Sequence, residues 1–163
     1  MSENYAQIAA LAKEQEDMLR FVRFTAEDAW SLGCFLAERA HAANLEIAIC
    51  IRKASGHILF QHCTQGTTIS NQQWMNRKFN TVLLTEGSSL RAWANLNDRG
   101  QTPADQGVSA MDYAYCGGGF PIRLTSGEFI GAVIVSNLPH REDHRFVAGG
   151  IAEYLHKTDM PYV

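Results

Sequence analysis

The sequence lacks long apolar runs, closely spaced cysteine pairs and an excess of basic charge. No apolar run approaches the roughly 18 residues that a membrane-spanning helix requires, so we expect no membrane association. The 14 Lys and Arg residues face 17 Asp and Glu residues, and the net charge of -3 gives no electrostatic reason to expect a nucleic-acid partner. The chain begins without a basic segment before an apolar one, so we expect no secretory signal.

Four cysteines lie far apart, and none of them forms a C-x-x-C pair. Because closed zinc sites usually show short paired spacings, a structural zinc site is disfavoured. Three of the four lie within apolar segments, where a free thiol packs as a small hydrophobic group. Reduced thiols and the missing signal together predict a cytoplasmic protein. The cysteines are Cys34, Cys50, Cys63 and Cys116.

No internal repeat, low-complexity tract or block of like charge interrupts the chain. Its length of 163 residues fits one domain of the usual roughly 100–200 residues. Hydrophobic residues make up 46% of the chain, as in an ordinary globular protein whose core needs no metal or disulfide. We therefore predict a single domain over residues 1–163.

The first part of the chain predicts two helices followed by a hairpin. Apolar residues recur at helical spacing over residues 5–19, and Thr25 is a typical N-cap for a second helix that ends near Asn44. Over residues 45–53, apolar and polar residues alternate as they do in a strand. A short turn leads to a second strand at 57–63, so the two strands should pair antiparallel.

The rest of the chain predicts three more helices and a second pair of strands. The apolar run from Phe129 to Val135 is typical of a central strand that is covered on both faces. Paired strands separated by helices indicate an α+β fold, an antiparallel sheet with helices packed against it. The predicted elements are a helix capped by Ser70, a short helix capped by Ser88 or Ser89, a long surface loop at 97–107, strands ending near Leu124 and spanning 128–136, and a helix at 141–156.

Three consecutive glycines, Gly117, Gly118 and Gly119, precede the second pair of strands. Backbone without side chains can bend sharply, and clustered N–H groups can bind an anion. The spacing is neither that of a dinucleotide fingerprint nor that of a P-loop. Two interpretations remain: a ligand-binding turn, or bare backbone that packs closely against a helix or another subunit.

His140 and His144 are four residues apart in the last predicted helix, with Asp143 between them. On a helix these side chains share one face, so the two histidines are candidate ligands for a divalent metal ion. The alternative is an ordinary helix start after Pro139, where Glu142 and Asp143 complement the helix dipole.

Trp74, Arg77 and Lys78 lie on one predicted helix. The two cations can pair with a carboxylate or a propionate, and Trp74 lies one turn before Lys78. The alternative is an amphipathic helix whose aromatic residues lie in a core or a subunit interface. On the second strand, His57 and His62 point to opposite faces, so they cannot hold one metal together, although one of them could be an axial haem ligand.

No catalytic triad can be assembled, because serines and histidines are numerous but no G-x-S-x-G elbow is present. Several segments of the chain instead form a recognisable combination: Phe24–Ala29, Trp74–Val82, Ser88-Ser89, Gly117–Arg123, Phe129–Ser136, Asp143 and Val147-Ala148. Together these segments resemble the haem-degrading-domain superfamily, which includes GlcG-like and HbpS-like proteins. The resemblance covers about residues 19–155 and is closest to the UPF-type branch of that superfamily.

The resemblance implies a profilin-like α+β fold, with an antiparallel sheet of about five strands and helices packed on it. It also implies a homo-oligomer, since such proteins assemble into rings or stacked multimers. Some members bind haem, and the superfamily name records a haem-degrading activity. The resemblance supplies no settled set of catalytic residues, so it leaves open whether this chain is an enzyme.

Two functions of different classes are therefore expected. In the first, a pocket near the three glycines binds a small anionic ligand such as haem. Its candidate residues are Trp74, Arg77, Lys78, Gly117, Gly118, Gly119 and His62. In the second, the chain is a non-catalytic homo-oligomeric scaffold, in which Trp74, Trp93, Phe120 and the glycines make subunit contacts.

Overall fold

One four-stranded antiparallel sheet organises the fold in the computed structural model, which describes residues 3–163. The strand order is β2-β1-β4-β3, and each neighbouring pair is antiparallel. The α+β prediction is confirmed, but the expectation of about five strands is wrong, because Phe21 makes only an isolated bridge with Leu124. The strands are β1 (Ala48–Lys53), β2 (Ile58–Cys63), β3 (Gly119–Arg123) and β4 (Phe129–Ser136).

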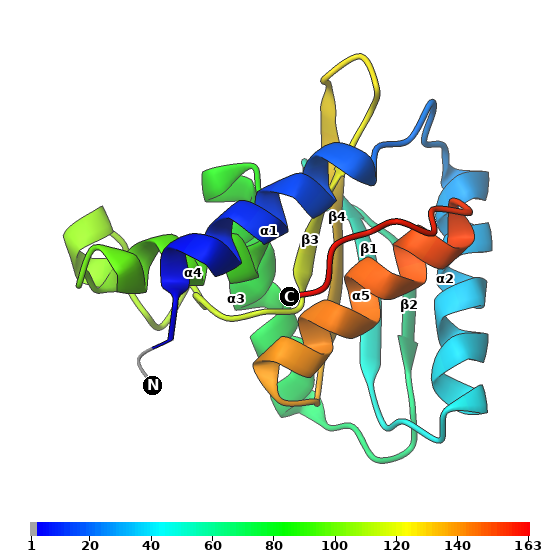
Figure 1. Ribbon diagram of the computed structural model, residues 1–163. Helices are drawn as coiled ribbons and strands as arrows, with labels where there is room; N and C mark the ends of the chain where they lie inside the picture. The colour runs from blue at the N-terminus through cyan, green and yellow to red at the C-terminus, as the bar shows by residue number, and fades with distance from the viewer. Residues whose placement is uncertain (1–2) are drawn as a thin grey trace.

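Helices cover both faces of this sheet (Figure 1). Two of them, α2 and α5, pack on one face, and α3 packs on the other. The remaining pair, α1 and α4, lies at one side of the sheet, where the two helices pack against each other. The helices are α1 (Tyr5–Met18), α2 (Ala26–Ala42), α3 (Ile69–Thr85), α4 (Ser89–Asp98) and α5 (His140–Tyr154), with a short 3-10 helix at Pro103–Gln106.

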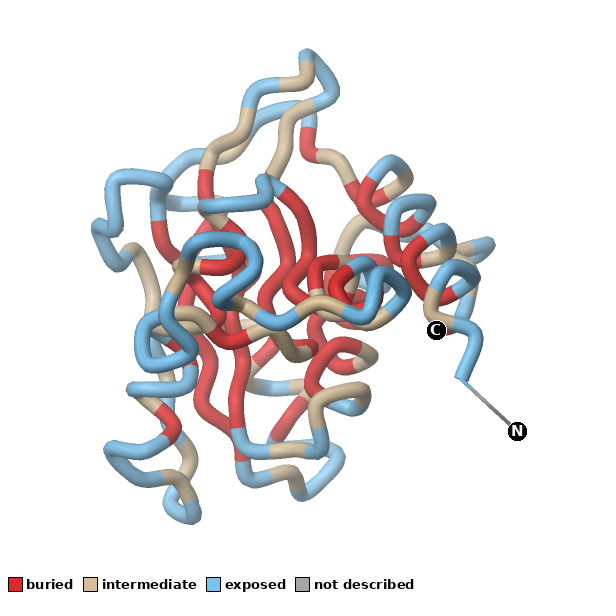
Figure 2. The backbone as a smooth tube through the Cα atoms, turned by 90° about the vertical axis from the view of Figure 1, so that its left-hand side faces the viewer, coloured by how far each residue is buried: buried red, intermediate tan, exposed pale blue. Residues whose placement is uncertain are grey.

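The two central strands carry the core (Figure 2). Side chains alternate across β1, so Ile49 and Ile51 face α2 and α5 while Ala48 and Cys50 face α3. The interior part of β4 is buried on both faces, as its apolar run predicts. Among the helices of the described residues, none has both the length and the apolar character that crossing a bilayer requires.

The helix starts follow local capping rules. Thr25 caps α2 as predicted, since its hydroxyl accepts the Asp28 N–H at 3.2 Å. The start predicted for α3 is wrong, because Thr68 and not Ser70 is its cap. The Asn71 side chain completes a capping box there by accepting the Thr68 N–H at 2.8 Å.

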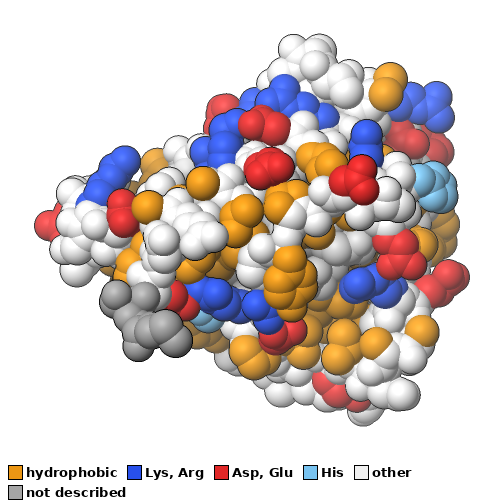
Figure 3. All heavy atoms as spheres, in the orientation of Figure 1, with side chains coloured by type: hydrophobic (Ala, Val, Ile, Leu, Met, Phe, Trp, Pro, Cys, Tyr) orange, Lys and Arg blue, Asp and Glu red, His pale blue; other side chains and the backbone are white. Residues whose placement is uncertain are grey.

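Side chains of both signs are interspersed on the face that carries α1, α2 and α5 (Figure 3). Several of them pair across elements. The Arg39 guanidinium, for example, lies 3.0 Å from the Glu153 carboxylate and joins α2 to α5. Such exposed pairs each contribute only about 0–1 kcal/mol, so the position of α5 is set mainly by apolar packing.

Candidate functional site

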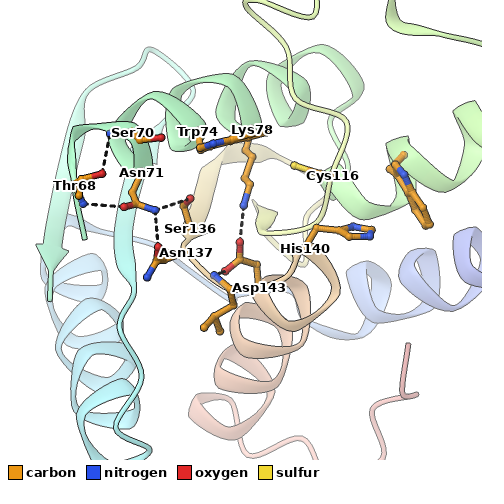
Figure 4. A pocket seen from close by; sticks show the side chains of 12 residues that line it. Thr68, Ser70, Asn71, Trp74, Lys78, Cys116, Ser136, Asn137, His140 and Asp143 are labelled. Atoms are coloured by element: carbon orange, nitrogen blue, oxygen red, sulfur yellow. Dashed lines mark hydrogen bonds and ion pairs between the residues drawn. The ribbon is translucent and has the colours of Figure 1, made fainter. Parts of the chain in front are cut away.

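A cavity of about 490 Å³ opens where α3, β4 and α5 meet (Figure 4). Its volume lies within the roughly 300–1,000 Å³ that is typical of small-molecule sites. It is therefore the candidate functional site. The residues that line it are Thr68, Ser70, Asn71, Trp74, Lys78, Trp93, Cys116, Ser136, Asn137, Leu138, His140 and Asp143.

A buried ion pair forms one wall of this cavity. The Lys78 ammonium of α3 donates to Asp143 Oδ2 of α5 at 2.7 Å and to the Val135 carbonyl of β4 at 2.9 Å. The two charged side chains are only 3% and 2% exposed. On the other side of the carboxylate, Oδ1 accepts the Leu138 N–H at 3.1 Å. The ion pair thus joins three elements of the fold at the cavity wall.

Burial raises the pKa of Asp143 above its usual value, and the Lys78 ammonium and nearby backbone N–H groups only partly offset this effect. Because Lys78 and Asp143 carry opposite charges at 2.7 Å, they leave little net charge on this wall. The one lysine of the cavity is therefore already committed to a carboxylate of its own chain.

The three glycines allow the backbone to pass close behind this ion pair. Gly118 has a φ of +122°, and a Cβ there would lie 2.6 Å from Lys78 Nζ and 2.7 Å from the Val135 carbonyl oxygen. A Cβ at Gly117 would lie 2.1 Å from the His140 carbonyl oxygen. The structure therefore contains the second arrangement considered for the glycines, in which bare backbone packs closely against helices.

Two of the glycine N–H groups already have acceptors within the chain. The Gly119 N–H donates to Ser89 Oγ at 2.9 Å, and the Gly117 N–H donates to His140 Nδ1 at a long 3.4 Å. The glycines thus stand behind Lys78 and do not line the cavity themselves. Their role in ligand binding stays a prediction.

Aromatic side chains also line the cavity. The His140 ring is half-buried, and its centroid lies 4.7 Å from that of Trp93 in an edge-to-face arrangement. Burial lowers the pKa of His140, and the nearby Arg141 charge adds to this effect, so the imidazole is neutral at neutral pH. Trp74 lies at the rim with 40% of its surface exposed.

Two helices begin at this cavity. Thr68, Ser70 and Asn71 belong to the start of α3, and His140 is the first residue of α5. The cap residue of α5 is Pro139, and no side chain caps this helix with a hydrogen bond. Because the first N–H groups of a helix carry partial positive charge, both helix starts favour an anionic group in the cavity.

Arg77 and His62 lie outside the cavity. The Arg77 guanidinium stacks 3.9 Å from the Trp74 ring centroid and donates to the Ala110 carbonyl at 3.4 Å. His62 lies on β2, where its Nε2 is 3.1 Å from Nε2 of His41. Of the residues predicted to bind a ligand, Trp74 and Lys78 are the ones that the structure brings into the cavity.

The two histidines predicted as metal ligands have different surroundings. His140 lines the cavity, whereas His144 is fully buried with its Nε2 2.7 Å from Gln15 Oε1 of α1. Burial lowers the pKa of His144 to about 3, so this imidazole is neutral. Within residues 3–163, no group of three or more His, Cys, Asp or Glu side chains could hold a metal ion. A site made of these two histidines stays a prediction.

Several cavity residues were not predicted from the sequence. The scaffold hypothesis places Trp93 in subunit contacts, and no sequence signal connects Asn71, Cys116 or Asn137 with a ligand. In the structure, Asn71 Nδ2 donates to Asn137 Oδ1 at 3.1 Å across one end of the cavity. Burial raises the pKa of the Cys116 thiol, which is therefore protonated at neutral pH.

Comparison with curated proteins gives close relatives. A UPF0303 protein of Rhizobium rhizogenes is 41% identical over 138 residues, which cover 85% of each chain. A UPF0303 protein of Yersinia enterocolitica is 35% identical over 154 residues, covering 93% of this chain and 90% of the relative.

Comparison with solved structures shows the same fold at lower identity. The crystal structure of Ybr137w superposes with a TM-score of 0.82 at 24% identity and covers 96% of this chain and 90% of that one. HbpS superposes with a TM-score of 0.65 at 16% identity, and the match covers 83% of this chain and 92% of HbpS. A PduOC:Heme complex superposes with a TM-score of 0.66 at 16% identity, and the match covers 80% of this chain and 94% of that one. The profile of the "Haem degrading protein HbpS-like" family matches residues 24–152, a range that includes every residue of the cavity. The chain therefore belongs to the HbpS-like family of haem-degrading proteins.

Proposed function

We propose that the cavity binds a small, flat ligand with an acidic group, and that haem is such a ligand. The observation that carries this proposal is the junction itself, where two indoles, a neutral imidazole and two helix starts surround about 490 Å³. Family membership and the likeness to a PduOC:Heme complex support haem as the ligand. On this proposal the chain is a ligand-binding protein.

The residues of the cavity suit both the flat apolar ring and the acidic group of such a ligand. The indoles of Trp74 and Trp93 offer apolar, flat surfaces to a macrocycle. His140 Nδ1 accepts the Gly117 N–H, so the proton of the neutral ring is on Nε2, which can donate to a carboxylate. The starts of α3 and α5 favour the negative charge of a propionate. Haem, when bound, would supply the redox-active iron.

Titration of the purified protein with haemin tests this proposal. We expect a shifted Soret band, and affinity lower by roughly 2–10-fold for Trp74→Ala, from the lost aromatic contact. We expect a loss of about tenfold or more for His140→Ala, because a hydrogen bond to a charged group is lost. His57→Ala, at an exposed position of the β1–β2 turn, is the matched control. Equal affinities in all four proteins, or no Soret shift at micromolar haemin, would contradict the proposal.

We also propose weak haem degradation, in keeping with the family name. The measurement is loss of the Soret band under dioxygen and a reductant, compared with free haemin at the same concentration. A rate equal to that of free haemin would leave binding as the function and remove the catalytic part of the proposal.

We propose further that the chain forms a homo-oligomer. Trp30, Ile69 and Met111 are 65%, 74% and 82% exposed, and large exposed apolar side chains often mark protein contacts. Phe120 is fully buried within the single chain, so it is not available for the subunit contacts expected of a scaffold. Light scattering on the eluting protein tests this proposal, and a monomer at micromolar concentration would contradict it.

We propose a reducing compartment, the cytoplasm, as the location of the protein. All four cysteines are free, and Cys63 is exposed on an edge strand, where an oxidising environment would put it at risk. Cell fractionation tests this proposal, and recovery of the protein in the periplasm would contradict it.

A further inference from the structure

Two histidines meet on the surface between α2 and β2, away from the cavity residues described above. His41 lies in the last turn of α2, and His62 lies near the end of β2. The two elements run side by side and end at the same edge of the molecule (Figure 1). Nε2 of His41 lies 3.1 Å from Nε2 of His62. His41 is exposed and His62 is half-buried, so solvent reaches the pair.

The separation of the two nitrogens suits two ligands of one metal ion. Imidazole nitrogens bind Zn²⁺ at about 2.0–2.1 Å, which places two of them about 3.3 Å apart at a tetrahedral angle and about 2.9 Å apart at a right angle. The observed 3.1 Å lies between these values. Both backbones are fixed, because α2 packs on the sheet and His62 pairs with Ile49 in the β1–β2 ladder.

The electrostatic surroundings favour a cation at this position. His41 lies in the last turn of α2, at the negative end of the helix dipole. The Glu46 carboxylate is close by. Hydrogen bonds from Thr64 and Gly66 lower its pKa, so this side chain is anionic at neutral pH.

We propose that His41 and His62 form a surface site for a divalent transition-metal ion of the kind that imidazole prefers, such as Zn²⁺. Two protein nitrogens hold the ion, and water fills its remaining positions. In the metal-free pair, one ring donates its Nε2 proton to the other. Metal binding requires this ring to carry its proton on Nδ1 instead, so both Nε2 lone pairs become free without net proton release. The site does not depend on the function proposed for the cavity.

The site differs from the metal site that the sequence suggests. His140 and His144 both lie on α5, whereas the new pair joins His62 of β2 to a histidine of α2. The sequence separates His41 and His62 by 21 residues and gives no short spacing that would connect them. The contact depends on the packing of α2 against the edge strand of the sheet.

Calorimetric titration with Zn²⁺ at about pH 7.5, where free histidines are mostly neutral, tests the site. We expect one saturable site per chain, with affinity at least tenfold weaker in His41→Gln and in His62→Gln. His57→Gln is the matched control, and Cys63→Ser tests the exposed thiol beside His62. These two variants should stay within twofold of the parent. In NMR spectra, Zn²⁺ should shift the Nε2 resonances of His41 and His62 alone.

Thermal unfolding supplies a second readout, because a ligand that binds only the folded state raises Tm. Zn²⁺ should raise the Tm of the parent protein, and this rise should be absent in His41→Gln and in His62→Gln. Parent-like affinity in both of these variants would overturn the proposal. Absence of saturable binding by the parent protein would overturn it as well, and would leave the two rings as a hydrogen-bonded pair only.

Discussion

Replacement of Lys78 by methionine removes the buried cation and keeps most of its apolar stem. The Asp143 carboxylate and the Val135 carbonyl then both lose the Lys78 ammonium as a donor, and Asp143 keeps the Leu138 N–H. Breaking a buried ion pair by removal of one partner typically costs about 3–5 kcal/mol, because the other charge stays buried without compensation. This is a large part of the roughly 5–15 kcal/mol that stabilises a typical domain. We expect Lys78→Met to lower the free energy of unfolding by about this amount at neutral pH.

The loss of unfolding free energy in Lys78→Met should depend on pH, and its direction follows from the pKa of Asp143. Burial already raises the pKa of Asp143, and the variant lacks the Lys78 charge that offsets this effect, so the pKa rises further. A group whose pKa is raised by folding loses its contribution to stability as pH increases through its folded-state pKa. The penalty of Lys78→Met is therefore largest above that pKa and becomes smaller as the pH falls and Asp143 takes up a proton.

Urea unfolding followed by circular dichroism at about pH 8 and about pH 5 measures both effects. Lys13→Met is the control, because Lys13 pairs with Asp17 on the exposed surface of α1 and its loss should cost at most about 0.5 kcal/mol. In Lys78→Met/Asp143→Asn, removal of both charges should cost less than the sum of the two single changes. A penalty below about 1 kcal/mol, or one that is equal at both pH values, would refute the reasoning.

Two further predictions concern the surroundings of the site. Gly118→Ala should destabilise the protein more than Gly56→Ala, because both positions have positive φ (+122° and +89°) but only at Gly118 would the Cβ meet other atoms. Backbone strain alone should cost about 1–3 kcal/mol in each variant. Equal losses of unfolding free energy in the two variants, measured by urea unfolding, would argue against the close contact at Gly118. Burial lowers the pKa of His144 from 6.5 to about 3, so its contribution is complete above pH 6.5 and is lost as pH falls toward 3. The stability difference between parent and His144→Leu should therefore change by up to roughly 4–5 kcal/mol over this range, and a pH-independent difference would contradict the buried neutral imidazole.

The elements that depend on near neighbours in the chain could be predicted from the sequence. Thr25 and Asp28 are three residues apart, and their capping box fixes the start of α2. The alternation over residues 45–53 predicts β1, and the short turn after it predicts the antiparallel pairing with β2. Ser70 was the wrong cap for α3 because Thr68 and Asn71 supply the better pair of reciprocal hydrogen bonds.

The site depends on contacts between distant parts of the chain, so its arrangement could not be predicted. The sequence predicts Lys78 as a ligand-binding residue and places Asp143 between two candidate metal ligands, yet Lys78 and Asp143 are 65 residues apart and neutralise each other. The separation of Arg77 from Lys78 has a similar cause. Consecutive residues on α3 point in different directions, so Lys78 enters the core while Arg77 stacks on Trp74 and does not line the cavity.

The ion pair also determines how the cavity can attract an anion. Since Lys78 and Asp143 cancel each other at the wall, the groups of the lining itself that favour an anion are the starts of α3 and α5 and the His140 N–H. The field of a helix start acts within about one turn, so it orients a bound carboxylate but attracts ligands only weakly from a distance. We therefore infer that binding of an anionic ligand depends mainly on contact with the cavity, and that its rate of association changes little with salt. A steep loss of association rate with ionic strength would show that exposed cations outside the cavity guide the ligand.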